Sequence, residues 1–180
     1  MKSLWFVIVA AAFYLFVVAL FWPYEKQLVF SNTSDVDTQG YAHARIQFSD
    51  TSITVQIPTT SATQELGLGG RRLLNDNEGM YWQYPTPERP SFWMKGMLIP
   101  LDFIWLNNGQ VVEVEADVPP PSNPTSTDLP IIQPDVQVDG VLEVSSGFIQ
   151  RHGIQVGDVA RVDVVTNHQT VNTGVDPALQ

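Results

Sequence analysis

The side chains best suited to bind a ligand in this 180-residue sequence lie around one short stretch, Trp93 to Lys95, with Asp102 shortly after it. On an extended segment, Trp93 and Lys95 would share one face while Met94 faces the other. A Trp beside a Lys can form a wall of a small-molecule pocket, in which the ammonium group receives an anion or a carboxylate. We therefore predict a ligand-binding groove lined by Trp93, Lys95 and Asp102.

The same residues also have a purely structural interpretation. Large aromatic side chains are usually buried for packing, which would place Trp93 and Met94 in the core. Lys95 would then be a solvated charge, or would form an ion pair with Asp102 across the bend at Pro100. Packing is the more frequent role for such residues, and the groove is the alternative.

Two arginines, Arg71 and Arg72, follow a pair of glycines and form a second candidate binding element. Together with the amides of the glycine loop they could hold an anion. The spacing of a phosphate-binding loop is absent, however. The structural alternative is that these arginines bond to chain carbonyls or pair with Glu78 or Glu143.

The remaining polar residues do not form a catalytic or metal-binding pattern. Three histidines, His43, His152 and His168, are far apart and lack the spacing of metal ligands. Cysteine is absent, which excludes disulfides, thiolate nucleophiles and zinc sites that use Cys. The acidic residues between positions 113 and 117 read as solvated charges on one face of a hairpin. We predict no catalytic residue, no metal site and no cofactor.

The composition limits the classes of partner. The formal net charge is −10, with only nine Lys and Arg residues. Such a surface repels phosphate backbones, so we predict no nucleic-acid binding. It also disfavours lying flat on anionic lipid. The length suits one compact domain with attachments.

The N-terminal segment is the strongest local signal. Residues 4–22, LWFVIVAAAFYLFVVALFW, contain no charge. A helix of this length spans about 28 Å, close to the hydrocarbon thickness of a bilayer. A cleaved signal peptide is the alternative, but this run ends in Phe21-Trp22-Pro23-Tyr24, which is too bulky for a peptidase site and suits an interfacial aromatic belt. A buried core helix would show a polar stripe, and this segment has none.

The charges around this segment predict its orientation. Lys2 and the terminal amine precede it, whereas Glu25 and Lys26 cancel after it. The positive-inside tendency then keeps residues 1–3 in the cytoplasm and exports the rest. We therefore predict a single-pass cell-membrane protein with residues 4–22 as the transmembrane anchor and residues 23–40 as a polar tether.

Residues 41–165 carry the patterns of a folded domain. Residues 44–48 and 53–57 alternate apolar and polar side chains around a turn and predict a hairpin. A short helix is expected from Thr59 or Ser61 through Leu66, followed by a helical turn at 71–75. Strands are expected at 79–84, 92–94 and 101–106, with a rigid proline loop at 85–90. The Asn107-Asn108-Gly109 turn predicts a second hairpin with 110–118.

The C-terminal part continues the same β-rich pattern. Residues 118–134 hold six prolines and predict an extended loop. A strand at 140–144 precedes a short helix capped by Ser145 or Ser146 and ended by Gly153, and a last strand covers 159–165. Residues 166–180 carry no pattern and are predicted to be disordered. The fold class is α+β: a curved antiparallel sheet or partly open barrel with two short helices, preceded by one transmembrane helix.

Three sequence blocks are characteristic of a known family, and they are ELGLGGRRLL at 65–74 with Gly79-Met80, FWMKGMLIPLDFIW at 92–105, and residues 141–147 with Gly153-Ile154 and Gly157-Asp158. With this order and spacing, the stretch from Arg45 to Val165 resembles the bacterial and archaeal domain of unknown function 192 family. The sequence departs from the family at Gly69, where Met is usual, and at Gly96-Met97, which replace an Asn-Thr pair. The resemblance implies a fold more than a function, and family members often follow a signal or anchor segment.

The function predicted from the sequence is that of a membrane-anchored, extracytoplasmic module that binds a small ligand, an envelope polymer or a partner protein. We favour a non-enzymatic role because no catalytic pattern is present. The first alternative is an envelope hydrolase with carboxylate chemistry, which would require two acidic residues converging in a cleft. The second is a structural accessory subunit, which would show an exposed apolar patch and no pocket.

Overall fold

The secondary-structure elements follow one another along residues 36–123, 126 and 129–164, which are the residues that this computed structural model describes. The elements in chain order are β1 (Tyr41–Gln47), β2 (Ser52–Pro58), α2 (Ser61–Leu66), β3 (Glu78–Glu88), β4 (Leu101–Asn107), β5 (Gln110–Val118), β6 (Val138–Ser145), α3 (Phe148–His152) and β7 (Arg161–Val164). The predicted anchor at 4–22, residues 23–35 of the predicted tether and the predicted C-terminal tail lie outside the described residues. No helix among the described residues is long and apolar enough to cross a membrane.

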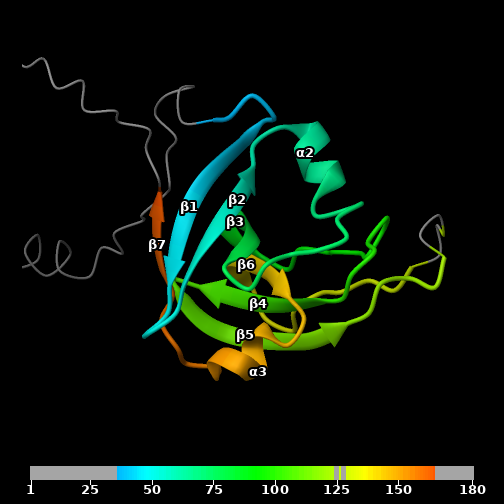
Figure 1. Cartoon of the computed structure of the whole chain (residues 1–180). Helices are drawn as coiled ribbons and strands as arrows, with labels where there is room; N and C mark the ends of the chain where they lie inside the picture. The colour runs from blue at the N-terminus through cyan, green and yellow to red at the C-terminus, as the bar shows by residue number, and fades with distance from the viewer. Residues whose placement is uncertain (1–35, 124–125, 127–128, 165–180) are drawn as a thin grey trace, which may run out of the picture.

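The strands form one curled sheet in the order β5-β4-β6-β3-β2-β1-β7 (Figure 1). All neighbours are antiparallel except β2 and β3, which run parallel because α2 and the following loop connect them. The segment just before β7 closes the sheet onto β5: Val111 N donates to Asp158 O at 2.8 Å, and Ala160 N donates to Gly109 O at 2.8 Å. The expected β-rich half-barrel with two short helices is confirmed.

Both predicted hairpins are confirmed. In the first, β1 pairs with β2 from Tyr41–Pro58 to Gln47–Ser52. In the second, the turn between β4 and β5 places Asn108 at φ 51° and Gly109 at φ 73°. Positive φ at both positions is the backbone of a type I′ turn, which Asn-Gly adopts readily and which matches the twist of the flanking strands. The local turn chemistry therefore sets this hairpin.

The sequence-based boundaries are wrong in several places. Residues 92–94 are not a strand; Phe92 only forms an isolated bridge with Ile132 of the proline-rich loop. Residues 71–75 form no helical turn. The proline-containing segment after Tyr84 continues β3 to Glu88, with an irregularity in its pairing to β6 that accommodates prolines lacking an N–H.

Both helix starts also differ from the prediction. Thr60, rather than Thr59 or Ser61, caps α2, because its hydroxyl accepts from Thr63 N at 3.2 Å while Thr60 N donates to Thr63 Oγ1 at 3.1 Å. Gly147 is the N-cap of α3, which therefore has no side-chain cap of its own. The predicted end of α3 is confirmed, since Gly153 adopts φ 62°.

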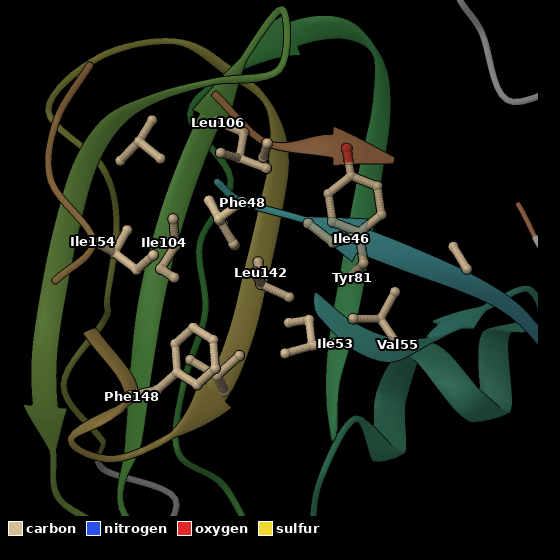
Figure 2. Packing of buried hydrophobic residues seen from close by; sticks show 14 of the residues in the cluster. Ile46, Phe48, Ile53, Val55, Tyr81, Ile104, Leu106, Leu142, Phe148 and Ile154 are labelled. Atoms are coloured by element: carbon tan, nitrogen blue, oxygen red, sulfur yellow. The ribbon is translucent and has the colours of Figure 1, made fainter. Parts of the chain in front are cut away.

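The central strands β3, β4 and β6 are buried on both faces, and each face carries its own apolar cluster. Alternation along each strand assigns the side chains: Leu142 and Val144 of β6 face inward, whereas Val141 and Glu143 face outward. We call these the inner face and the outer face. The inner cluster is a continuous apolar core: Ile46, Ile53 and Val55 meet Ile104, Leu106, Leu142 and Phe148 across the half-barrel (Figure 2).

Candidate ligand-binding cavity

A cavity of about 160 Å³ lies on the outer face of the sheet, beneath α2 and the segment 91–97. Its wall combines aromatic and polar side chains, and the residues that shape it include Trp82, Tyr84, Phe92, Trp93, Lys95 and Glu143. Alternation along β3 places Met80, Trp82 and Tyr84 on this face. The cavity is therefore built by a packed sheet face, which provides a rigid floor, and by a helix and a loop that roof it.

Glu143 lies on the floor of the cavity and is only 5% exposed. It is on β6 between Met80 of β3 and Phe103 of β4, both apolar, and its carboxyl group makes no ion pair with any described residue. Burial raises the pKa of Glu143 to about 8, since the charged form loses its hydration. At neutral pH this side chain is therefore mostly a neutral acid, able both to donate and to accept a hydrogen bond.

Trp82 and Tyr84 bring further polar groups to the same floor. The indole N–H of Trp82 lies close enough to oppose part of the rise in the pKa of Glu143. Among the described residues, however, its buried Nε1 has no hydrogen-bond partner of normal distance and angle, so the indole N–H can donate to a ligand. Burial, reinforced by Glu88 and Glu143, raises the pKa of Tyr84, so this phenol stays neutral. The floor thus holds a neutral acid, a phenol and a free indole donor.

The exposed lining residues form the opening of the cavity. Trp93 is 52% exposed, so the interpretation of Trp93 as a core residue is wrong, whereas Met94 is buried as that interpretation expected. Lys95 Nζ lies 5.9 Å from the centre of the Trp93 ring and 3.9 Å from Glu65 Oε1 of α2. Both charged groups of this pair are exposed, so the pair contributes little and can separate when a ligand arrives.

Asp102 does not belong to this cavity. It is fully buried on the inner side of β4, whereas its neighbours Leu101 and Phe103 line the cavity. One carboxylate oxygen of Asp102 accepts from Gly147 N at 3.2 Å, and the other accepts from Ile149 N at 2.9 Å. Asp102 also accepts from Asp117 N at 2.9 Å. The proposed ion pair with Lys95 is therefore wrong, and Asp102 serves instead to hold the start of α3, which lacks a cap of its own.

The two arginines lie beside the cavity without lining it. Arg71 is half-buried and donates to the side chain of Gln56 on β2, rather than to Glu78 or Glu143. Arg72 is exposed. Their loop is attached to the loop of Lys95 by a hydrogen bond from Gly70 N to Gly96 O at 2.9 Å. Of the five predicted site residues, the structure brings together Trp93 and Lys95 at the opening and places the arginines next to them.

The departure from the family pattern at Gly96 has a simple conformational account. Gly96 adopts φ 69° in the turn where Met97 N donates to Met94 O at 3.1 Å. This left-handed conformation is open to glycine and, among other residues, mainly to Asn and Asp. Asn, the usual family residue, and the Gly of this chain therefore suit the same turn, which projects Lys95 toward the opening.

Sequence reasoning missed the floor of the cavity. Glu143 entered it only as a possible partner of an arginine, and Trp82 and Tyr84 were read as strand residues without a role. The available signal was an acidic residue in the middle of the apolar run Val141–Val144, on a strand without another charge in that run. A charge is rarely fully buried unless it is paired or has a function.

The side chains of this arrangement offer several kinds of contact to a ligand. Aromatic rings offer flat apolar surfaces, Glu143 and the Trp82 indole offer hydrogen bonds, and Lys95 offers a positive charge. Among the described residues, no group of three His, Cys, Asp or Glu side chains is placed to hold a metal ion. The cavity therefore suits a small molecule with both a polar edge and an apolar face.

Comparison with known proteins agrees with this fold. The model of the DUF192 family, described as "Uncharacterized ACR", matches residues 44–162. A crystal structure from Sinorhizobium meliloti 1021, of a protein proposed to be a transcription regulator, is 25% identical, with a TM-score of 0.60 over 68% of this chain and 95% of that one. A protein of unknown function from Novosphingobium aromaticivorans is 26% identical, with a TM-score of 0.57 over 73% and 94%. No curated protein matches the sequence.

Proposed function

This chain belongs to the DUF192 family, and we propose that it is a binding module whose outer-face cavity takes one small molecule or one unit of an envelope polymer. The observation that carries the proposal is Glu143, a residue only 5% exposed whose carboxyl group has no ion-pair partner among the described residues and opens onto an aromatic cavity. Such a group costs stability, because burial disfavours its charged form and leaves hydrogen-bonding capacity unused. A ligand that bonds to it would recover that cost.

We further propose that this module works outside the cytoplasm on a membrane anchor. The support is the uncharged run at 4–22 and the charges that flank it. An extracytoplasmic position would bring the cavity close to envelope polymers, whose sugar rings are suited to an aromatic wall. Fusing a reporter enzyme that is active only outside the cytoplasm to the C-terminus tests this placement; activity that requires residues 4–22 supports it, and a soluble cytoplasmic product contradicts it.

A second candidate function, carboxylate-based hydrolysis of an envelope polymer, is favoured by one observation. Glu65 and Glu143 both line the cavity, and the pKa of Glu143 suits a general acid near neutral pH. The glutamates differ strongly in environment, since Glu65 is exposed and pairs with Lys95. Release of reducing ends from peptidoglycan or polysaccharide, abolished in Glu143→Gln, would establish hydrolysis. Intact polymer after prolonged incubation would leave binding as the function.

We do not extend the proposed regulatory role of the Sinorhizobium protein to this chain. Transcription regulators contact DNA phosphates through basic surfaces, whereas this chain carries a net charge of −10. A structural accessory role fits less well than binding, because a closed apolar face would serve such a role without an unpaired buried carboxyl group.

Thermal unfolding of the full chain in an uncharged polyoxyethylene detergent tests the binding proposal. The compounds are sugars, peptidoglycan fragments, nucleotides and amino acids, each titrated against the wild type, Trp93→Ala and the matched control Val156→Ala. Val156 is an exposed apolar residue, 63% exposed, that does not line the cavity. We expect a concentration-dependent rise in melting temperature in the wild type and the control that Trp93→Ala weakens. A rise of equal size in Trp93→Ala would place the ligand elsewhere.

A further inference from the structure

Positive charge is concentrated around the opening of the cavity. The two loops that form this rim, residues 67–77 and 89–100, contain Arg71, Arg72, Arg89 and Lys95 against one acidic residue, Asp76, in a chain with a net charge of −10, and Glu65 of α2 pairs with Lys95. The hydrogen bond from Gly70 N to Gly96 O holds the two loops together. A local cluster of cations on an acidic protein attracts anions to this one place.

Two charges of the rim, those of Lys95 and Arg72, are only weakly satisfied within the protein, whereas Arg71 donates to Gln56. Among the described residues, Lys95 forms an ion pair with one acidic side chain, Glu65 at 3.9 Å, and the side chains of both residues are more than half exposed. Arg72 is exposed and forms no ion pair with a described residue. Breaking an exposed ion pair at this distance costs little free energy when Lys95 turns toward a ligand. The rim can therefore accept a carboxylate or a phosphate.

The floor of the cavity prefers hydrogen-bond acceptors at neutral pH. Glu143 is mostly protonated there and has an O–H to donate, and the indole N–H of Trp82 is unpartnered. The other titratable groups around this floor are the neutral phenol of Tyr84 on β3, Glu65 on α2 and Lys95 in the loop, while β4 contributes only apolar side chains. A cationic ligand would have to displace the proton of Glu143 and pass Lys95.

The volume limits the ligand to a single ring. A cavity of about 150 Å³ accommodates one benzene-sized molecule, and this cavity measures about 160 Å³. Trp82 and Phe92 meet edge to face, with their ring planes 78° apart, so one aromatic ring at a time, such as that of the exposed Trp93, can stack against a face of such a ligand. Hydroxyl and ring oxygens of a sugar would meet the donors on the floor.

We infer that the ligand is an acidic sugar, either free or as one unit of an acidic polysaccharide, with its ring against the aromatic wall and its carboxylate held by Lys95 at the rim. This inference rests on the proposed binding function and adds the charge and the shape of the ligand to it. Arg71 and Arg72 attract the anion, and in a polymer they contact the acidic groups of the neighbouring units.

Calorimetric titration of the full chain in the same uncharged detergent tests this inference. The probes are D-glucuronate, D-glucose, choline, D-galacturonate and trigalacturonate. We expect glucuronate to bind at least about tenfold more tightly than glucose, since a hydrogen-bonded charge contributes about that much. Lys95→Gln should remove this preference. Glu65→Gln should strengthen glucuronate binding by releasing Lys95. The matched control, Arg45→Gln, removes an exposed cation from β1, far along the sheet from the cavity, and should leave the affinity unchanged.

The pH dependence provides a second readout. Glucuronate binding requires the protonated form of Glu143, so its affinity should fall about tenfold from pH 7 to pH 9 as the acid, with a pKa of about 8, ionises. In Glu143→Gln the affinity should be independent of pH over this range, because the amide keeps a donor. A melting curve for Glu143→Gln like that of the wild type at pH 7 ensures that the comparison concerns folded protein.

The outcomes separate the inference from the proposed function. Equal affinity for glucose and glucuronate, or choline binding that strengthens as the pH rises, would overturn the acidic-sugar inference while the binding module stands. Absence of binding for every probe here and in the thermal panel would overturn both. Tighter binding of trigalacturonate than of D-galacturonate, its own monomer, supports a polymer as the source, and equal binding supports the free sugar.

Discussion

The two faces of the central strands differ in kind although they share the same backbone. Toward the inner face, β3, β4 and β6 present Tyr81, Ile104 and Leu142 to a core in which almost every side chain is apolar (Figure 2). Toward the outer face, the same strands present Trp82, Phe103 and Glu143 beneath a short helix and a loop. One face is closed by the curl of the sheet itself, and the other is roofed by elements that leave a space.

This difference shows where the domain can accommodate a function. A polar group in the inner core would have to displace packed apolar side chains on several strands. The outer face already contains larger aromatic residues whose edge contacts, such as Trp82–Phe92 at 5.4 Å, leave gaps between flat surfaces. The inner face therefore supplies stability, and the outer face carries the buried carboxyl group on which the proposed ligand binding rests.

The largest expected effect is a pH dependence that belongs to the outer face alone. The folded-state pKa of Glu143 is about 8, above its ordinary value of 4.5. Between pH 4.5 and pH 8 the folded protein therefore keeps a proton that the unfolded chain has lost. The contribution of Glu143 to the free energy of unfolding is complete below pH 4.5 and is lost as the pH rises to about 8. The loss is about 1.4 kcal/mol per pH unit, or roughly 4–5 kcal/mol in all.

Urea unfolding of the wild type and Glu143→Gln from pH 5 to pH 9 measures this contribution. The difference in the free energy of unfolding between the two proteins should shift steadily in favour of the variant up to about pH 8 and then level off. A difference that does not change with pH would mean that Glu143 is charged in the folded state, and the distinction between the two faces would lose its main support.

The inner face should respond most strongly to loss of volume. Phe148 of α3 is fully buried in the inner core, so Phe148→Ala should lower the free energy of unfolding by about 3–5 kcal/mol at any pH. The measurement is the urea midpoint at pH 6, compared with the wild type. A loss below about 1 kcal/mol would show that the inner face is loosely packed. The two faces would then not differ in packing as described.

Asp102 should behave as an inner-face residue although it is acidic. Asp102→Ala removes the acceptor for three backbone N–H groups and should destabilise the fold by about 3 kcal/mol, because those donors would be left buried. The affinity for any cavity ligand should stay within about twofold, measured on protein that is folded by circular dichroism. A selective loss of affinity with normal stability would instead support the sequence-based groove of Trp93, Lys95 and Asp102.

The smallest effect on stability is expected at the opening of the cavity. Trp93 is half-exposed, so Trp93→Ala should change the free energy of unfolding by about 0.5 kcal/mol or less. The same substitution should weaken ligand binding, since it removes part of the aromatic wall. A destabilisation of several kcal/mol would indicate that the indole supports the roof of the cavity, and the roles of packing and binding could not then be separated.

The parts of the fold that could be predicted from sequence are those fixed by local rules. The Asn108-Gly109 turn sets the second hairpin, and alternating side chains set the first. The end of α3 at Gly153 follows from a conformation that glycine adopts most easily. In each of these cases the determining residues lie within a few positions of the feature that they produce.

Only half of the candidate site could be predicted, because the other half depends on contacts between residues that are far apart in the sequence. Trp93 and Lys95 were recognisable because they are adjacent and chemically unusual. The floor could not be found, because the strand pattern around Glu143 does not show that its face is covered by α2. The place of Asp102 depends on β4 lying beside β6, which brings it to the start of α3. Such contacts join positions more than forty residues apart, and no local pattern reports them.

The acidic side chains of β5 have a consequence for the behaviour of the protein at high concentration. Beyond its first residues, β5 has no second neighbouring strand among the described residues, and this open edge carries Glu113, Glu115 and Asp117. Mutual repulsion between copies opposes edge-to-edge pairing, the usual route to aggregation of sheet proteins. Burial and the nearby Glu113 raise the pKa of Glu115. Glu115 therefore takes up a proton at a higher pH than an ordinary glutamate, and mild acidification already weakens the repulsion between copies. Light scattering should therefore increase on mild acidification, before the fold is lost.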